Sequence, residues 1–219
     1  MKTNKVAVAG ILLFVVAAFA LGVSLYRKHV HSAQDQTVSA EQTRLVRMHS
    51  PILGPQGAPV TIVEFFDPAC ETCRAFYPIV KSLMAKYPED VRLVIRYAPF
   101  HRGSDQVVKL LEAARRQGKY QLVLEAVLQA QPTWADHSQP DPDLTLELSR
   151  AVGLDIERAR QDMARPEMQA LLDQDLEDLK ALQVSRTPTF FVQGRSLPSF
   201  GPDQLAEVPH VYRILTQRA

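Results

Sequence analysis

The chain of 219 residues contains two cysteines, Cys70 and Cys73, with two residues between them. A cysteine thiolate attacks disulfides and binds soft metals, and a C-x-x-C pair that follows a strand and opens a helix is typical of thiol-disulfide exchange. A bridge between these two cysteines closes a very short ring, so it removes little entropy from the unfolded chain. We therefore expect redox chemistry from the pair rather than a stabilising disulfide.

The two cysteines are expected to have different roles. Cys70 lies where a helix should begin, and the unpaired amides and the dipole of a helix amino terminus favour a thiolate, which is the attacking species. Cys73 lies one turn further along, where it is shielded and can resolve a mixed disulfide. We expect Cys70 to be the nucleophile and Cys73 the resolving thiol.

A metal site is the alternative chemistry for such a pair. Structural zinc usually takes four nitrogen or sulfur ligands, and no second cysteine pair exists. A copper site involving His101 or His137 stays open, although histidines in loops are usually solvated. A non-catalytic binding module or a soft-metal chaperone is thus the second hypothesis, whereas the redox hypothesis needs no metal and no cofactor.

Glu71 and Thr72 separate the cysteines and are candidates for tuning their redox properties. A carboxylate beside Cys70 disfavours its thiolate, which raises the pKa of the thiol and makes the disulfide a weaker oxidant. The alternative is that Glu71 points into solvent, where its charge is screened and only stabilises the first turn of the helix.

The periodicity of apolar residues predicts the elements that position this pair. A β-branched run predicts a strand over Val60–Phe66, and helical spacing continues past the cysteines to Lys86, interrupted by Pro78, which is expected to kink the helix. The further elements expected are strands at 91–98, 189–192 and 196–197, helices at 104–118, 120–129, 143–152, 155–164 and 166–182, a loop at 132–143, and a C-terminal helix from about Pro202.

The amino-terminal residues 1–29 are expected to direct the chain to a membrane. An uncharged run of about 20 residues lies between Lys5 and Arg27. It is long enough to span a bilayer, which favours an uncleaved anchor. The alternative is a cleaved signal of residues 1–20, because a small-x-small pattern lies near Ala20. Residues 30–50 are polar and are expected to form a tether or a short exposed helix. The remaining residues 51–219 have the length of one domain, and a net charge of +1 argues against a nucleic-acid binder, which needs a concentrated basic face.

Three motifs resemble one known family. The segments V-E-F-F-D-P-A-C-E-T-C at 63–73 and T-P-T-F-F-V-Q-G at 187–194, together with Arg96-Tyr97-Ala98-Pro99, are similar to the DsbA-like branch of the thioredoxin superfamily. The resemblance implies an α/β thioredoxin fold with a helical domain inserted at about 103–183. It also implies a protein thiol-disulfide oxidoreductase, either an oxidase or a less oxidising reductase or isomerase.

The resemblance implies three further site residues. An acid at the place of Glu64 is buried under the active site in this family and shuttles the proton of the resolving cysteine, whereas the alternative here is an exposed glutamate on an edge strand. Thr187 is expected to offer its backbone to an extended substrate segment, and the bond before Pro188 is expected to be cis. Trp134 is expected to pack within the helical insertion.

The expected partners follow from the same hypothesis. The expected substrates are proteins with cysteines, and a membrane protein is expected to exchange electrons with the cysteine pair. The amino-terminal helix is expected to anchor a monomer on the periplasmic side of the inner membrane. If residues 1–20 are cleaved, the protein is expected to be soluble in the periplasm. Thr187 before the proline and Glu71 in the pair favour a weaker oxidant than DsbA. The direction of electron flow stays open.

Overall fold

The computed structural model describes Gly22 and residues 42–197. Apart from Gly22, the expected membrane segment lies outside the described residues, as do most of the expected tether and the C-terminal helix expected near Pro202. Within the described part of the chain, no helix has both the length and the apolar composition needed to cross a bilayer.

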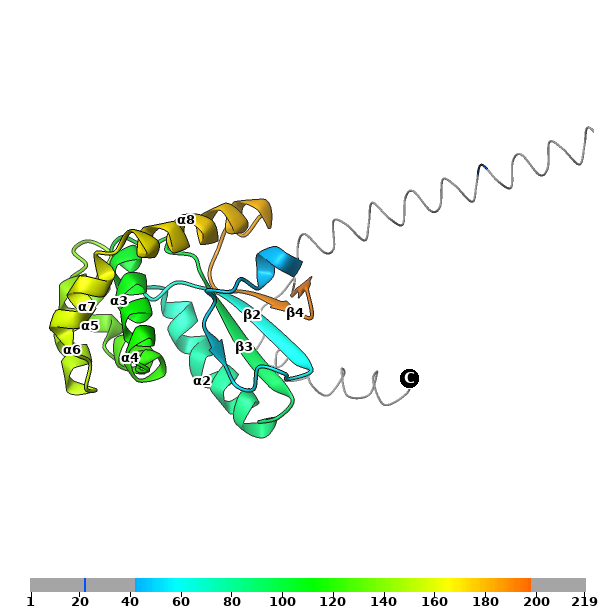
Figure 1. Cartoon of the computed structure of the whole chain (residues 1–219), viewed down its shortest axis with the longest axis horizontal. Helices are drawn as coiled ribbons and strands as arrows, with labels where there is room; N and C mark the ends of the chain where they lie inside the picture. The colour runs from blue at the N-terminus through cyan, green and yellow to red at the C-terminus, as the bar shows by residue number, and fades with distance from the viewer. Residues whose placement is uncertain (1–21, 23–41, 198–219) are drawn as a thin grey trace, which may run out of the picture. The chain divides into compact units, whose positions relative to one another are not determined.

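A five-stranded sheet with the order β1-β3-β2-β4-β5 forms the centre of the unit that begins at Arg44 (Figure 1). Its central strand β2 (Val60–Phe66) runs parallel to β3 (Val91–Tyr97) and antiparallel to β4 (Thr189–Val192). The edges are β1 (Ile52–Leu53) and β5 (Arg195–Ser196), each antiparallel to its neighbour. Side chains of β2 contribute to two separate hydrophobic cores, so both faces of β2 are covered, which explains why the strand is almost continuously apolar.

Helix α2 (Glu71–Lys86) connects β2 to β3 and continues through Pro78. Its buried side chains recur at helical spacing and belong to the main hydrophobic core with residues of the sheet. The first of them is Cys73, followed by Tyr77, Val80 and Leu83. The same amphipathic face that anchors the helix therefore buries the second cysteine.

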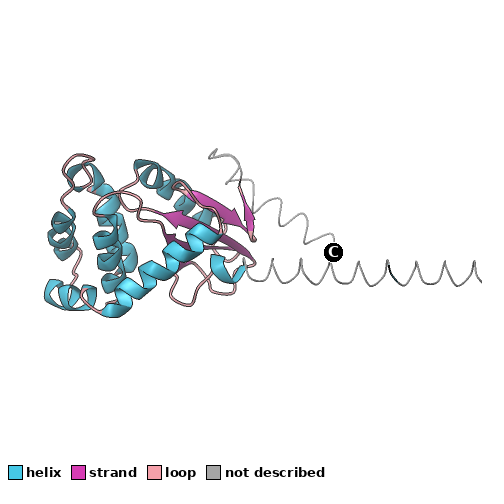
Figure 2. Cartoon of the chain, turned by 90° about the horizontal axis from the view of Figure 1, so that it is seen from above, coloured by secondary structure: helices cyan, strands magenta, loops and turns pink. Residues whose placement is uncertain are grey.

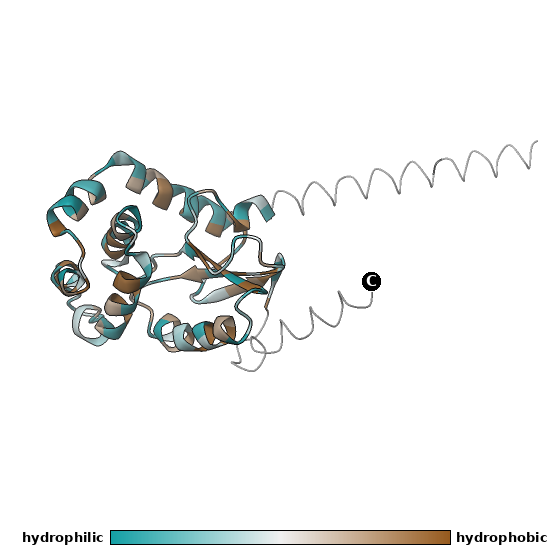
Figure 3. Ribbon diagram, turned by 60° about the horizontal axis from the view of Figure 1, so that its bottom comes forward, coloured by the Kyte–Doolittle hydropathy of each residue, from teal (hydrophilic) through white to brown (hydrophobic). Residues whose placement is uncertain are grey.

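Six helices between β3 and β4 form the insertion. Figure 1 shows α3 to α7 gathered beside one end of the sheet, and Figure 2 shows α8 running back across it. Figure 3 shows both hydropathy colours on these helices, as expected for elements with one apolar face. The helices are α3 (Ser104–Arg116), α4 (Tyr120–Gln129), α5 (Gln131–Trp134), α6 (Pro142–Ala151), α7 (Ile156–Met163) and α8 (Pro166–Ala181).

Trp134 fills the interior of this insertion. Its side chain is fully buried, and its indole Nε1–H donates to the carbonyl of Val127 at 2.9 Å. The donor on the indole ring is therefore satisfied, which allows the whole side chain to be buried. The expectation that Trp134 packs within the insertion is confirmed.

Several predicted boundaries were wrong for local reasons. Ser104 is not the cap of α3; Gly103 takes the cap position with φ +84°, and Ser104 is the first helical residue. The predicted loop at 132–143 contains the short helix α5, and α6 begins at Pro142 behind the cap Asp141, whose carboxylate accepts from the amide of Leu144. Proline suits the first helical position because no amide partner is needed there.

The end of the predicted tether is part of the packed unit. Leu45 is buried in a small core on the sheet, and the guanidinium of Arg47 donates from Nε and Nη2 to the two carboxylate oxygens of Asp178 at 2.7 and 2.6 Å. His49 Nε2 lies 2.6 Å from Asp175 Oδ1. Residues 45–50, which were expected to be an exposed tether, are thus fixed onto helix α8.

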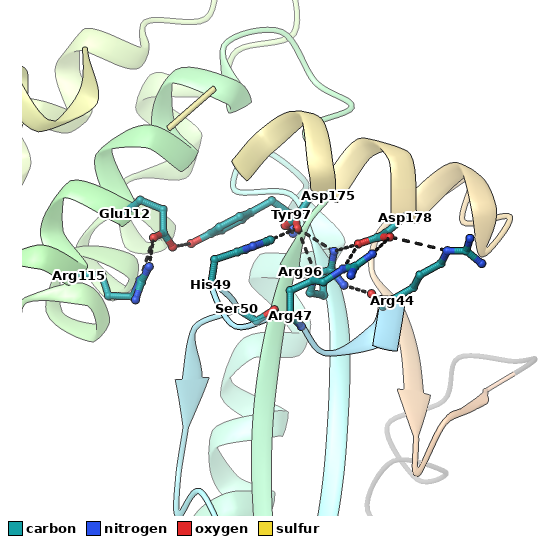
Figure 4. A network of polar contacts seen from close by, with 10 residues as sticks. All are labelled: Arg44, Arg47, His49, Ser50, Arg96, Tyr97, Glu112, Arg115, Asp175 and Asp178. Atoms are coloured by element: carbon teal, nitrogen blue, oxygen red, sulfur yellow. Dashed lines mark hydrogen bonds and ion pairs between the residues drawn. The ribbon is translucent and has the colours of Figure 1, made fainter. Parts of the chain in front are cut away.

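These contacts extend a buried group of charges that we call the arginine cluster: Arg47, His49, Arg96, Asp175 and Asp178 (Figure 4). The fully buried Arg96 pairs through Nη2 with Asp175 at 2.7 Å and with Asp178 at 2.8 Å. Asp175 also accepts from the amide of Tyr97 at 2.8 Å. The cluster joins the end of β3, the insertion helix α8 and the amino-terminal segment.

Candidate active site

Cys70 lies at the junction of β2 and α2. Strand β2 ends at Phe66, a short turn follows, and Cys70 caps α2 with an extended backbone, while its carbonyl accepts from the amide of Arg74 at 3.1 Å. Cys73 is fully buried, Cys70 is 6% exposed, and both thiols are free. The pair is therefore placed as a helix amino terminus requires for an accessible nucleophile above a shielded thiol.

The surroundings of Cys70 favour its thiolate. The thiol of Cys73 donates a hydrogen bond to the sulfur of Cys70, and this contact contributes most to lowering the pKa of Cys70 to about 5. Burial opposes the shift, and the side chain of Thr187 and the backbone amides of Thr72 and Cys73 add to it. A thiol with this pKa is almost fully ionised at neutral pH.

Cys73 has the opposite property. Burial raises the pKa of Cys73 far above its ordinary value, its donation to Cys70 adds to the shift, and the nearby charge of Glu64 acts in the same direction. The second cysteine therefore holds its proton while Cys70 carries the negative charge. A buried group nearby has to deliver or remove that proton during exchange.

Glu64 is buried on β2, so the alternative of an exposed edge-strand glutamate is wrong. Its side chain is 1% exposed, and its neighbours across the sheet are Ile95 and Phe190. Burial, and then the negative charge of Cys70, raise the pKa of Glu64 to about 8, and its Oε1 has no hydrogen-bond partner. The carboxyl is therefore largely protonated at neutral pH; its role as a proton shuttle stays a prediction.

Thr187 and Pro188 lie directly beside the nucleophile. The bond between them is cis, Pro188 is buried, and the Sγ of Cys70 lies 3.4 Å from the carbonyl oxygen of Thr187. Residues 117 positions apart in the chain therefore meet at the reactive sulfur. The contact is the one expected if the backbone at Thr187 holds a substrate segment, but that role is a prediction.

Asp67 organises the turn before Cys70, and the motif alone did not single it out. Its fully buried carboxylate accepts from the amides of Ala69, Phe100 and His101 at 2.8 to 2.9 Å and from the hydroxyl of Ser104. It fixes the turn after β2 to the loop that follows β3. The signal in the sequence was an acidic residue directly after an apolar strand.

Gln131 was also missed, and it connects the insertion to the same turn. Its buried side-chain amide donates from Nε2 to the carbonyls of Pro68 at 2.8 Å and Cys70 at 3.0 Å. The carbonyl of Pro68 lies in the turn, outside the regular ladders, and the carbonyl of Cys70 at the helix cap also accepts from the amide of Arg74. The first residue of α5 thus holds the backbone on which the nucleophile is mounted.

Glu71 and two histidines surround the entrance to the site. The side chain of Glu71 is 54% exposed, and its Oε1 lies 2.7 Å from Nε2 of His137. His101 Nδ1 lies 2.7 Å from Oδ2 of Asp67, and the two imidazole rings are 6.0 Å apart. The pKa of Cys70 is lowered, chiefly by the hydrogen bond from Cys73, so the raised pKa predicted from Glu71 is not found.

The metal-site hypothesis requires side chains that converge as ligands, and residues 42–197 contain no such cluster. No group of three His, Cys, Asp or Glu side chains in this described part of the chain converges as a metal ion requires. The imidazoles at the site are instead paired with carboxylates.

Comparison with known proteins agrees with this geometry. A family model described as thioredoxin matches residues 47–208. The chain belongs to the thioredoxin family, in its DsbA-like branch. The match includes the strand, the cysteine pair, the whole helical insertion and the strand that follows Pro188.

Solved structures of thioredoxin-family proteins share the fold. A thioredoxin-like oxidoreductase from Silicibacter pomeroyi DSS-3 is 33% identical, with a TM-score of 0.68, and the match covers 78% of this chain and 96% of that one. BdbD from Bacillus subtilis is 22% identical, with a TM-score of 0.66, over 74% and 91% of the two chains. The alpha-DsbA1 of Wolbachia pipientis is 16% identical, with a TM-score of 0.69, over 82% and 99%.

Curated relatives match over a limited part of their length. The Na(+)/H(+) antiporter NhaA of Herminiimonas arsenicoxydans is 32% identical over 146 residues, which are 67% of this chain and 22% of that protein. The antiporter NhaA 3 of Salinispora tropica is 34% identical over 147 residues, with the same 22% covered. The chain spans about a fifth of the length of these relatives.

Proposed function

We propose that the chain is a thiol-disulfide oxidoreductase that exchanges disulfides with the cysteines of other proteins. One observation carries this proposal: Cys70 caps α2 with its pKa lowered to about 5, in contact with the loop at Thr187, while Cys73 lies buried behind it as a thiol. A nucleophile and a resolving thiol need this difference in ionisation and access.

In the oxidising direction, a substrate thiolate attacks Sγ of Cys70 in the Cys70–Cys73 disulfide. The bond between the two cysteines breaks, and Cys73 leaves with the electron pair and takes the proton of Glu64, which regains a proton from solvent. A second substrate thiolate then attacks the substrate sulfur of the mixed disulfide, and Cys70 leaves as a thiolate. The substrate loses two electrons and becomes a disulfide, while the cysteine pair gains them. The reducing direction is the reverse.

The pKa of Cys70 supports an oxidant of intermediate strength. The nucleophilic cysteine has a pKa of about 7 in thioredoxin and about 3.5 in DsbA, and a more stable thiolate makes the reduced form more favourable. A pKa of about 5 lies between them. We expect a reduction potential between about −270 mV and about −120 mV, and re-oxidation by a membrane redox partner.

The proposed location is the periplasmic side of the inner membrane, with the apolar run between Lys5 and Arg27 as the anchor of a monomer. Fractionation of cells tests this placement, because an anchored chain stays with the membrane after a salt wash. Amino-terminal sequencing tests the alternative. A soluble form that begins near Leu21 means that the run is a cleaved signal.

Equilibrium with glutathione tests the proposed activity. The full chain is incubated in buffers with increasing ratios of reduced to oxidised glutathione, and the fractions of thiol and disulfide are counted by mass after acid quenching and alkylation. We expect one reversible transition at a potential between those of thioredoxin and DsbA. Cys73→Ser is expected to trap a mixed disulfide with glutathione on Cys70. A chain that stays fully reduced or fully oxidised across these buffers refutes the proposal.

A further inference from the structure

The exchange reaction does not use His101 or His137, yet both lie at the site. His101 belongs to the loop between β3 and α3, and His137 belongs to the loop between α5 and α6, so the thioredoxin fold and its insertion each contribute one. Their rings are 6.0 Å apart. We call these two residues the histidine pair.

Each imidazole is bound to a carboxylate next to the nucleophile in the sequence. Nδ1 of His101 lies 2.7 Å from Oδ2 of Asp67, which is fully buried, and Nε2 of His137 lies 2.7 Å from Oε1 of Glu71. Asp67 precedes Cys70 by three residues and Glu71 follows it directly. The histidine pair therefore contacts the chain on both sides of the reactive sulfur.

The carboxylate of Asp67 has one titratable side chain among its described partners, the imidazole of His101. The amides of Ala69 and Phe100, the amide of His101 and the hydroxyl of Ser104 are neutral donors. The imidazole of His101 is the titratable donor among its printed contacts, and a buried carboxylate is stabilised most when such a donor is charged. The environment thus favours the imidazolium form of His101, which remains 33% exposed at the site entrance.

Three groups act on the charge of His101: Asp67, Cys70 and Glu71. Burial by itself lowers the pKa of His101, but the hydrogen bond and charge of Asp67 and the charges of Cys70 and Glu71 outweigh it, and the pKa is raised. Coupling between two titrating sites is reciprocal. If the thiolate of Cys70 stabilises the imidazolium, the imidazolium stabilises the thiolate.

His137, the other histidine, acts on the carboxylate of Glu71. Its carboxylate has its pKa lowered first by its own backbone amide, against the effect of burial, and then by the hydrogen bond and charge of His137 and the charge of His101. A carboxylate paired with an imidazole projects less negative potential onto its neighbours. The acid between the cysteines therefore opposes the Cys70 thiolate less than its position suggests.

We propose that the histidine pair sets the leaving ability of Cys70: the imidazolium of His101, held by Asp67, stabilises the thiolate by its charge, and the hydrogen bond between His137 and Glu71 weakens the opposing effect of that carboxylate. Both are positioning residues in this sense, because they act through Cys70 and Glu71. The inference rests on the proposed exchange activity. In its second step the bond between Cys70 and the substrate sulfur breaks with the electron pair on Cys70, so a nearby cation makes the oxidised protein a stronger oxidant.

The test measures the pKa of Cys70 by the ultraviolet absorbance of its thiolate in the reduced full chain, together with the glutathione equilibrium. For His101→Gln we expect the pKa to rise by about one unit, and the oxidising equilibrium constant to fall about tenfold, which corresponds to about 30 mV. His101→Lys restores a cation and is expected to keep the pKa within about 0.3 unit of the wild type.

Glu71 provides the second arm of the test. For His137→Gln we expect a rise in the pKa of Cys70 of about 0.3 to 0.5 unit, because the carboxylate is released from its partner. When His137→Gln is combined with Glu71→Gln, the added histidine substitution is expected to leave the pKa of Cys70 unchanged. His49→Gln is the matched control, since His49 also pairs with a buried aspartate, at 2.6 Å, but in the arginine cluster.

The outcomes separate the inference from the proposed function. A wild-type chain without a reversible disulfide refutes the exchange activity itself. If the wild type exchanges normally and folded His101→Gln leaves the pKa of Cys70 unchanged, the inference is wrong. It is also wrong if His101→Lys raises the pKa as much as His101→Gln does, because His101 then has only a structural role, or if His49→Gln has an equal effect.

Discussion

Buried carboxylates lie at the ends of the two neighbouring parallel strands β2 and β3, and they are bound by different kinds of partner. After β2, the carboxylate of Asp67 is bound by neutral donors and by the imidazole of His101. At the end of β3, Asp175 and Asp178 are bound by Arg96, whose side chain is fully buried, and Asp178 is bound also by Arg47. The first group borders the nucleophile, and the second attaches helix α8 and the amino-terminal segment to the sheet.

The two groups of carboxylates differ in whether the charge of their partner can change with pH. A guanidinium keeps its proton at any pH at which the protein is folded, so the positive charges of Arg47 and Arg96 in the arginine cluster are fixed. Although burial raises the pKa of Asp178, the hydrogen bonds from Arg47 and Arg96 outweigh it and keep the pKa below its ordinary value. An imidazole titrates near neutral pH and can respond to the charge of a sulfur. Stability is therefore expected to depend on the arginine cluster, and reactivity on the group around Asp67.

The largest effect is expected from Arg96→Met. The substitution leaves two buried carboxylates without their shared cation, so the free energy of unfolding should fall by about 3 to 5 kcal/mol. Urea denaturation of the full chain measures it. Arg150→Met is the matched control, because Arg150 forms an exposed pair with Glu147 and its loss should lower stability far less. Equal effects of the two substitutions would remove the distinction between the clusters.

Glu64 is a third kind of buried carboxyl, because no cation is bound to it among the described contacts. Its pKa is raised to about 8, first by burial. The unfolded chain ionises Glu64 at lower pH than the folded one, so this group lowers stability as the pH rises from about 4.5 to about 8, and the loss levels off above that.

Glu64→Gln should remove that slope and stabilise the reduced protein at pH 8 relative to pH 5 by a few kcal/mol at most. Chemical denaturation of the reduced wild type and variant at the two pH values measures the difference. A variant that follows the wild type at both pH values contradicts the raised pKa. Exchange with glutathione should become slower in the same variant, since the proton donor to Cys73 is lost.

A smaller effect is expected from Gln131→Leu, which tests how the insertion supports the active-site turn. The carbonyl of Pro68 loses its donor, whereas the carbonyl of Cys70 keeps the amide of Arg74, and one unsatisfied buried carbonyl should cost about 1 to 3 kcal/mol. Gln169→Leu is the control, because Gln169 is exposed on α8 and should change stability by less than about 0.5 kcal/mol. Equal stability of the two variants would mean that the insertion does not hold the turn.

The sequence predicts the parts of this molecule that depend on local patterns. The helix Tyr120–Gln129 and the strand Thr189–Val192 have the predicted bounds, because uninterrupted apolar periodicity and clear breakers define both. Glu64, the cysteine pair and the Thr187–Pro188 bond could be selected because they belong to motifs with fixed spacing. Four of the five strands were predicted, whereas the two-residue edge strand β1 (Ile52–Leu53) was missed because it is too short for a periodic pattern.

The missed residues act across long separations. Asp67 binds His101 from 34 positions away, and Gln131 reaches Pro68 across 63, without any pattern that marks single polar residues as partners. His137 and Glu71 are 66 positions apart, so the sequence showed an acid beside the nucleophile but not the base that neutralises it. The polar composition of residues 30–50 likewise concealed that Arg47 binds Asp178.

The most direct test of the account is the alkylation of the reduced full chain by iodoacetamide at a series of pH values, with each modified cysteine located by mass spectrometry. The account predicts that Cys70 is labelled with a half-maximal rate near pH 5, while Cys73 stays unlabelled as long as the protein is folded. A half-maximal rate near about pH 8.5, as for an ordinary thiol, or equal labelling of both cysteines, contradicts it.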